Sequence, residues 1–209
     1  MQNSTNISTY RRDLRHKILD EAMNMFKQQG IKKVKMDDIA ASLSISKRTL
    51  YEIYENKEQL LYEGMERDAH LRMAHLDNFA LSAANEMEIV IEAIKIHLED
   101  LSRINPLFFT ELHKYKSVVT YHERCADENR KRSVEFIRKG VEHGFFLPDM
   151  NYEIVTRISD GVMKHVISTK MCERFSPRDI FVNYVCVVIR GICTEKGIES
   201  IDNLLRSKG

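Results

Sequence analysis

The sequence contains few of the residues that interrupt helices. Its 209 residues include only three Pro and eight Gly. Helix interiors disfavour both residue types, so their scarcity favours a chain that is largely helical. No alternation of apolar and polar residues is long enough to predict a strand, and no repeat of about 20 to 50 residues is present. We therefore expect an all-α fold.

Cysteine is scarce as well, and its spacing does not suit a metal site. The chain has four cysteines, Cys125, Cys172, Cys186 and Cys193. They form no C-x-x-C pair and have no His-rich spacing beside them, which argues against a zinc site. We expect neither a metal nor a cofactor. Cys186 and Cys193 share one predicted helix and are expected to be buried, with a redox role as the alternative. His113 and His122 are alternative metal ligands, although solvated or hydrogen-bonded side chains are the simpler interpretation.

Long apolar segments are lacking too. No stretch of about 18 uninterrupted apolar residues is present, so no membrane span is expected. The N-terminus from Gln2 to Thr9 is polar and has no segment typical of a signal peptide. These features predict a cytoplasmic protein with reduced thiols and no membrane partner. The sequence also has no Gly-rich phosphate loop, G-x-S-x-G or H-E-x-x-H motif, so we do not expect an enzyme.

Charge is distributed unevenly along the chain, although the total is only +1. Residues 1–57 carry 11 Lys and Arg against 7 Asp and Glu, whereas residues 58–209 carry 21 against 24. A basic N-terminal segment suits contact with phosphate, and the slightly acidic remainder does not. This difference predicts a DNA-binding domain over residues 1–57 and a second domain over residues 58–209.

Helical periodicity is clear in the N-terminal segment. Apolar residues recur every three or four positions between Tyr10 and Phe26, and Gly30 follows where a left-handed backbone can end a helix. Residues 1–9 are polar, and we expect them to fray. Two short helices are predicted next, over residues 36–43 and 47–54.

Capping residues and prolines define the remaining predicted helices. Ser46 is the expected N-cap of the helix over 47–54, and Asn56 is the expected N-cap of a fourth helix that begins at Lys57. Further helices are predicted over 86–103, 107–117, 121–143, 152–171 and 177–196. Pro106, Pro148 and Pro177 fall at the breaks between them.

The two short helices are joined by a tight turn, Ser44-Ile45-Ser46. A helix, a tight turn and a second helix form the arrangement in which the second helix enters a DNA major groove. Polar and basic side chains at its start suit phosphates and base edges. We predict DNA contacts from Lys35, Ser46, Lys47, Arg48, Thr49, Tyr51 and Lys57. The alternatives are a helical hairpin without DNA and a packing role for Tyr51.

Taken in order, these residues resemble the tetracycline-repressor (TetR) family of regulators. The resemblance covers about 50 of the 209 residues. It is carried by Ile18, Leu19, Ala22, Phe26, Gly30, Asp38, Ile39, Ala40, Ile45, Ser46, Lys47, Thr49, Leu50, Tyr51, Tyr54 and the run from Lys57 to Leu61. The family uses a tyrosine and a lysine on phosphate, which implies that role for Tyr51 and Lys57.

The chain departs from the family pattern at four positions of the motif. Ser44 stands where a glycine is usual, so it must tolerate a strained backbone. Arg48 replaces a small residue, Ile53 replaces an aromatic residue or His, and Lys35 replaces a threonine. These changes leave the fold prediction intact. They bear on the DNA sequence preference, because Arg48 can read a base.

The two last predicted helices are apolar on more than one face. A surface helix would show a single stripe, so a second face is expected to bury against a partner. Two such helices from each of two subunits would form a four-helix interface about a two-fold axis, and the resemblance implies the same. The predicted interface residues are Val162, Val166, Phe181, Tyr184, Val188 and Ile192. A deeply buried helix in a monomer is the alternative.

The resemblance also implies that a small ligand binds within the helical region after residue 57. Aromatic and Met side chains with a few polar groups suit an apolar pocket. The candidate lining is Phe79, Phe108, Phe109, His113, Tyr115, Tyr121, Phe136 and Met163, with ordinary core positions as the alternative. The predicted fold is thus a three-helix helix-turn-helix DNA-binding domain followed by a helical ligand-binding and dimerisation domain.

We expect a homodimeric repressor that binds double-stranded DNA at a near-palindromic operator and is released by a small-molecule effector. One alternative is a DNA-binding regulator or activator without an effector. Another is a helical binding module that has lost DNA binding. Lys47, Arg48 and Lys57 favour DNA binding over the latter.

Overall fold

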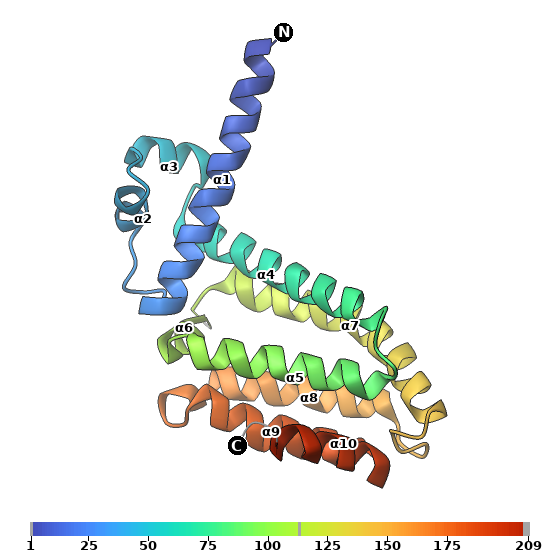
Figure 1. The fold of residues 1–209 in the computed structure, drawn as a ribbon. Coiled ribbons are helices and arrows are strands. Elements are labelled where there is room, and N and C mark those ends of the chain that lie inside the picture. The colour runs from blue at the N-terminus through green and yellow to red at the C-terminus, as the bar shows by residue number, and fades with distance from the viewer. Residues whose placement is uncertain (1, 113, 207–209) are drawn as a thin grey trace. The chain divides into compact units, whose positions relative to one another are not determined.

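The computed structural model describes residues 2–112 and 114–206, which are mostly helical (Figure 1). The helices are α1 (Gln2–Gln29), α2 (Met36–Ser42), α3 (Lys47–Ile53), α4 (Lys57–Ala80), α5 (Glu86–Arg103), α6 (Pro106–Leu112), α7 (Lys116–Glu142), α8 (Tyr152–Ser168), the 3-10 turn η1 (Met171–Glu173), α9 (Pro177–Ile192) and α10 (Glu195–Arg206). In the described part of the chain, extended pairing is limited to one isolated bridge between Phe146 and Cys193. The prediction of an all-α fold is confirmed.

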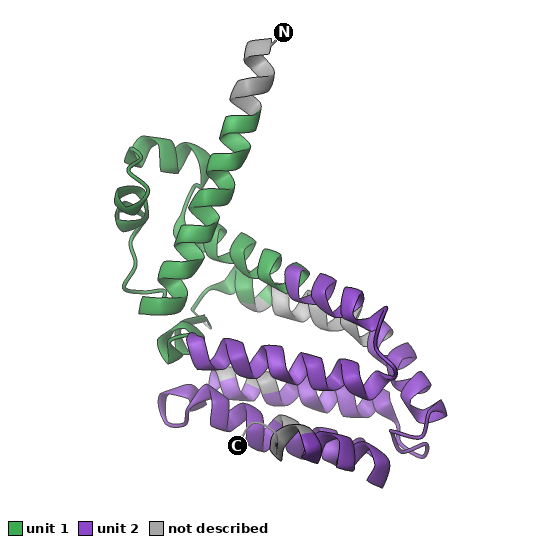
Figure 2. Cartoon of the chain, viewed as in Figure 1, with its two compact units in different colours: residues 1–70, 104–121 green, residues 71–103, 122–209 purple. Residues whose placement is uncertain are grey.

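Two compact units interleave along the sequence (Figure 2). Unit 1 comprises residues 1–70 and 104–121, and unit 2 comprises residues 71–103 and 122–209. The first half of α4 and the whole of α6 therefore belong with the N-terminal helices. The division into a DNA-binding domain over residues 1–57 and a second domain over residues 58–209 stays a prediction.

Unit 1 is built around one face of α1. Leu14, Ile18, Ala22 and Phe26 recur at helical spacing, and all four are buried, as the periodicity predicted. They share one hydrophobic cluster with residues of the later helices, which include Ile39, Leu50, Tyr54, Leu60, Leu61, Phe108 and Leu112. Close packing of this kind fixes α2 and α3 against α1.

Gly30 and α6 shape the end of α1. Gly30 has a φ of +86°, the left-handed conformation that commonly ends a helix. A Cβ at Gly30 would lie 2.9 Å from the Leu107 Cβ, so α6 approaches this closely only because the residue is glycine. Beside it, the Lys32 backbone N–H donates to the Glu111 carboxylate at 2.6 Å. A segment from the middle of the chain thus completes the N-terminal unit.

The turn between α2 and α3 contains a residue in a left-handed conformation. Ser44 has a φ of 55°, which confirms that this non-glycine residue adopts a strained backbone. The turn is closed by backbone N–H groups of Ser44 and Ile45, which donate to the Ala41 and Ala40 carbonyls at 3.0 Å each. These bonds offset the cost of the left-handed residue.

Unit 2 has a smaller cluster of described buried residues, namely Met87, Phe145, Phe146, Cys193 and Ile201. Cys186 is buried as well, so the expected burial of both Cys186 and Cys193 is confirmed. No helix among the described residues combines the length and apolarity that crossing a membrane requires.

Three predicted helix bounds near α1 and α6 are wrong. α1 begins at Gln2, whereas we expected residues 1–9 to fray, and this polar stretch has no Pro or Gly to interrupt it. The helix predicted over 107–117 ends at Leu112, and the next begins at Lys116 rather than at 121. Glu58 explains the early start of α7. Its carboxylate accepts from the backbone N–H of Ser117 at 2.9 Å and from the Ser117 hydroxyl at 2.6 Å.

The helices predicted over 152–171 and 177–196 are also too long. α8 ends at Ser168, and α9 ends at Ile192, after which the separate helix α10 was not predicted. Thr194 holds the second break: its backbone N–H donates to the Phe145 carbonyl at 2.9 Å, and its hydroxyl donates to the Gly144 carbonyl at 2.7 Å. A contact between segments this far apart in sequence leaves no trace in a local helical pattern.

Candidate nucleic-acid interface

Two local features fix α3, the predicted recognition helix. Ser46 caps its start, because the serine Oγ accepts from the Thr49 backbone N–H at 3.0 Å, as predicted for this N-cap. On the opposite face, Leu50 and Tyr54 have no exposed surface and anchor the helix in the core of unit 1. The remaining face, with Lys47, Arg48, Tyr51 and Glu52, is exposed.

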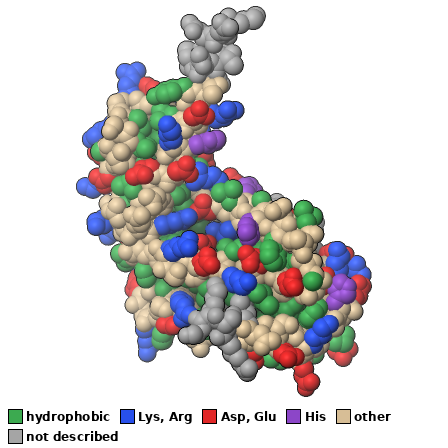
Figure 3. Space-filling model, in the orientation of Figure 1, with side chains coloured by type: hydrophobic (Ala, Val, Ile, Leu, Met, Phe, Trp, Pro, Cys, Tyr) green, Lys and Arg blue, Asp and Glu red, His purple; other side chains and the backbone are tan. Residues whose placement is uncertain are grey.

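Both cations on this exposed face are paired with carboxylates. The Lys47 ammonium donates to Asp37 of α2 at 2.6 Å, and the Arg48 Nε donates to Glu52, one turn later, at 2.9 Å. These pairings raise the pKa of Lys47 and of Arg48, so both side chains stay charged. Figure 3 shows that basic and acidic side chains are interspersed over the whole visible face of unit 1.

The other predicted DNA-contact residues surround α3 in different settings. Half of the Tyr51 surface is exposed and half is covered, so its phosphate contact stays a prediction beside the alternative packing role. Lys35 is exposed just before α2, and its backbone N–H donates to the Asp38 carboxylate at 2.9 Å. Ser46 is exposed and Thr49 is half-buried, with their hydroxyls 2.8 Å apart.

Lys57 is held by the protein. Its ammonium donates to the Ile31 and Val34 carbonyls at 2.9 Å each, which ties the start of α4 to the loop between α1 and α2. Burial lowers the pKa of Lys57, and the Glu111 charge opposes that change. An ammonium has three N–H donors, so one remains beyond these two bonds. Its contact with phosphate stays a prediction.

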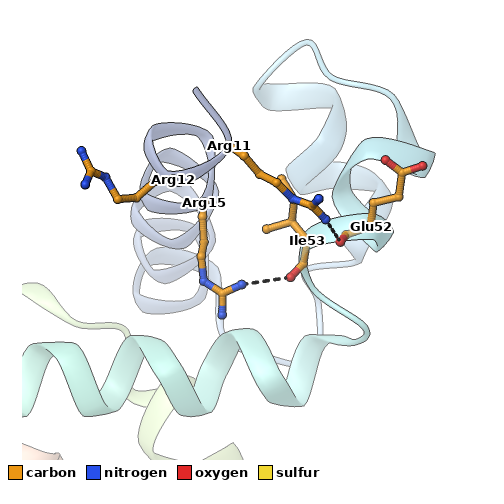
Figure 4. A pocket seen from close by; sticks show the side chains of 5 residues that line it. All are labelled: Arg11, Arg12, Arg15, Glu52 and Ile53. Carbon is orange, nitrogen blue, oxygen red and sulfur yellow. Dashed lines mark hydrogen bonds between the residues drawn. The ribbon is translucent and has the colours of Figure 1, made fainter. Parts of the chain in front are cut away.

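Sequence reasoning missed a group of arginines on α1. Arg11, Arg12 and Arg15 line a hollow of about 320 Å³ together with Glu52 and Ile53 at the end of α3 (Figure 4). Arg11 donates to the Glu52 carbonyl at 3.0 Å, and Arg15 donates to the Ile53 carbonyl at 3.2 Å. Cations at a helix C-terminus satisfy carbonyls that have no partner within the helix. Arg12 points away from the other two arginines.

Arg15 also connects α3 to α4. One terminal nitrogen donates to both oxygens of Glu63, at 2.6 and 2.7 Å, and the guanidinium lies 4.6 Å from the centre of the Tyr54 ring. The sequence signal was two arginines four residues apart on a helix. That signal becomes informative only once the helix facing them is known.

The residues predicted to line an effector pocket fall in both units. In unit 1, Phe108 is buried, and Phe109 and Tyr115 pack against the same core. In unit 2, Phe79 is half-buried, and Phe136 packs with its ring 6.5 Å from that of Phe146. His113 and the side chains of Tyr121 and Met163 lie outside the described residues. The side chains of Cys125 and His122 lie outside the described residues as well.

The residues predicted for a dimer interface lie on α8 and α9 in unit 2. Val166 is buried, whereas Val162, Phe181, Tyr184, Val188 and Ile192 are half-buried. Ile192 packs against the cluster of unit 2, and the Phe181 ring lies 4.3 Å from the His97 ring. Three other apolar side chains of α8 and α9 are more exposed: Ile154 is 54%, Ile158 60% and Val187 67% exposed.

Comparison with known proteins agrees with this geometry. Residues 18–63 match the family model described as bacterial regulatory proteins, tetR family. The transcriptional repressor KstR2 of Mycolicibacterium smegmatis is 26% identical over 200 residues, covering 88% of this chain and 92% of that protein. A TetR-family regulator from Cytophaga hutchinsonii matches the fold with a TM-score of 0.65 and 15% identity, covering 89% of this chain and 98% of that one.

A second solved structure shares the fold at similar coverage. It is a transcriptional regulator from Saccharomonospora viridis in complex with choline, with a TM-score of 0.61 and 20% identity. The alignment covers 88% of this chain and 100% of that chain. At these identities, both solved structures establish likeness of fold.

A capped helix that follows a tight turn and presents basic side chains on its exposed face defines a helix-turn-helix DNA-binding protein. The matched residues 18–63 run from within α1 into α4 and include that whole motif. Residues 18–63 therefore match the N-terminal region that the tetR model describes, and most of the chain is similar to a transcriptional repressor.

Proposed function

We propose that this chain is a homodimeric repressor whose two α3 helices bind a near-palindromic operator, and that a small organic molecule releases it. The observation that carries the proposal is α3 itself. The helix is anchored by fully buried Leu50 and Tyr54, while Lys47, Arg48 and Tyr51 lie on its exposed face. An anchored helix with exposed, charged side chains on its outer face is suited to major-groove readout.

Within this proposal, Lys47 and Tyr51 bind phosphate, Arg48 reads a base, and Lys35 with Lys57 adds phosphate contacts from the starts of α2 and α4. Ser46 and Thr49 contribute hydroxyl donors at the start of α3. Phosphate contacts place a protein on DNA, and base contacts select the sequence.

Exposed apolar side chains on unit 2 support the dimer. Ile154 and Ile158 are one turn apart on α8, so they share a face, and Val187 on α9 is exposed to a similar degree. A dimer interface formed by α8 and α9 would remove these apolar side chains from water, which favours association. The two α3 helices of such a dimer, about one duplex turn apart, would then contact two half-sites together.

The effector is proposed from the relatives and from the aromatic side chains of the helical region. One solved structure of the same fold contains choline. Phe79 and Phe136 supply aromatic side chains in unit 2. An effector that binds one conformation better than the other would shift the population away from the state that fits the operator.

DNA binding is tested by fluorescence anisotropy with a labelled duplex from upstream of the gene, between about 50 and 200 mM salt. We expect affinity to fall steeply with salt, because bound phosphates release counterions. Lys47→Ala and Lys57→Ala should each lower affinity and reduce the salt dependence by about one released ion. Arg138→Ala, a paired surface arginine of unit 2, is the control. Absence of salt-sensitive binding by the unmodified protein would overturn the proposal.

Dimerisation is tested by sedimentation equilibrium. Ile158→Asp should produce monomers and weaken operator binding, whereas Leu81→Asp, at an apolar position that is 86% exposed, should not.

A thermal-shift screen that starts with choline tests the effector, since a ligand that binds only the folded state raises stability by about 2.7 kcal/mol at 100 times its dissociation constant. A compound that stabilises the protein should also release the duplex.

A further inference from the structure

Glu52 poses a problem for a DNA-binding surface. It lies on the exposed face of α3, with 55% of its side chain accessible. A carboxylate at this position faces the phosphates of a bound duplex, and like charges at close range are unfavourable. The fold does not explain the side chain, because the contact from Arg11 uses the Glu52 backbone carbonyl, which any residue would provide.

The contact that the structure gives the Glu52 carboxylate is with Arg48. The Arg48 Nε donates to Glu52 Oε1 at 2.9 Å, and 88% of the Arg48 side chain is exposed. We propose that Glu52 is a specificity-determining residue, which holds the Arg48 guanidinium by Nε so that its two terminal nitrogens are presented to a guanine. This inference rests on the DNA-binding function proposed above.

The position of this bond on the guanidinium is decisive. A guanidinium has five N–H donors, and only one of them is on Nε. Pairing at Nε leaves the two terminal nitrogens, which together match the O6 and N7 acceptors of guanine. In Arg15, by contrast, both terminal nitrogens are engaged, one with the Ile53 carbonyl and the other with Glu63. Arg48 and Arg15 therefore differ in whether both terminal nitrogens are available to a base.

Glu52 also limits attraction to DNA of any sequence. Lys47 and Arg48 are balanced by Asp37 and Glu52, so these four side chains have no net charge. Sequence-independent binding depends on unbalanced positive charge near phosphate. A carboxylate here weakens that binding, while the bidentate contact of Arg48 with guanine is retained. The ratio of specific to non-specific affinity rises as a result.

The test uses full-length protein and two measurements. The first is affinity for a scrambled duplex as a function of salt, and the second is base preference in a selection from a half-site library with randomised positions. For Glu52→Gln we expect about two- to fivefold tighter binding to the scrambled duplex. We also expect about a tenfold loss of preference for G·C at one position, since a good bidentate contact is worth about that much discrimination or more.

Two further variants separate the parts of the proposal. Arg48→Lys should lose the same G·C preference, because an ammonium cannot form the bidentate contact. Glu55→Gln removes the same charge from an exposed residue just beyond α3, so it should tighten non-specific binding without changing base preference. If Glu52→Gln behaves like Glu55→Gln in both measurements, the positioning role of Glu52 is overturned while the proposed function stands. If the unmodified protein does not bind DNA, both are overturned.

Discussion

The two sides of α3 use charged and apolar groups in opposite ways. On the inner side, Leu50 and Tyr54 are fully buried, and Arg15 is committed to the end of α3 and to Glu63. On the outer side, Lys47 and Arg48 make ion pairs that are mostly exposed. Exposed ion pairs contribute little to stability, whereas buried contacts contribute much. The inner side therefore determines where the helix lies, and the outer side is available for DNA.

The largest effect is expected from shortening a side chain on the inner side. Leu50→Ala should lower the free energy of unfolding by about 3 kcal/mol, because it removes buried methyl groups and leaves a cavity. Leu71→Ala, at a position of α4 that is 61% exposed, should change it by less than about 0.5 kcal/mol. Urea denaturation of both variants provides the comparison. Equal effects would show that Leu50 does not anchor α3.

A smaller effect is expected from Arg15→Met, which keeps much of the side-chain length and removes the charge. Glu63 and the Ile53 carbonyl would lose the donors that Arg15 supplies. We expect the free energy of unfolding to fall by about 1.5 kcal/mol. This is less than for a fully buried group, because the Arg15 side chain is 40% exposed. Arg12→Met is the matched control, since Arg12 points away in Figure 4. DNA affinity should fall for Arg15→Met alone, as the end of α3 loses its position.

Tyr54 predicts a pH effect on the inner side. Burial raises its pKa above that of an exposed tyrosine. A raised pKa in the folded state means that stability is fully present below about pH 10, the unfolded value, and is lost as pH rises beyond it. Tyr54→Phe should cost only about 0.5 kcal/mol at pH 7, because the hydroxyl bond to the Arg15 carbonyl is long, at 3.5 Å.

The measurement for Tyr54 is unfolding by urea from pH 8 to 11. The fall in stability above pH 10 should be shallower in Tyr54→Phe than in the unmodified protein. If Tyr54→Phe shows the same alkaline slope as the unmodified protein, Tyr54 does not ionise on unfolding.

The same contrast explains how far the sequence predicts this molecule. Features set by neighbours in sequence were predicted correctly, including the Ser46 cap and the start of α4 at Lys57. They depend on capping and on helical periodicity within a few residues. The exposed face of α3 followed from the same signals, because its buried residues are spaced four apart.

Features set by contacts between distant segments were missed. The break before α10 depends on bonds from Thr194 to Gly144 and Phe145. The commitment of Lys57 to two carbonyls, and of Arg15 to Glu63, depends on how α1 packs against α4. A basic residue in a sequence is equally consistent with a DNA contact and with a structural one, so the packing decides between them.

The smallest effect on stability is expected on the outer side, from Lys47→Ala. Its ion pair with Asp37 is exposed, with 67% and 48% of the two side chains accessible, so the free energy of unfolding should change by less than about 0.5 kcal/mol. Affinity for upstream DNA should nevertheless fall about tenfold, because the ammonium exchanges Asp37 for phosphate when DNA binds. Asp37→Asn should have the opposite sign and tighten binding. A Lys47→Ala variant that loses stability and keeps its DNA affinity would contradict the conclusion that the outer side of α3 binds DNA and the inner side stabilises the fold.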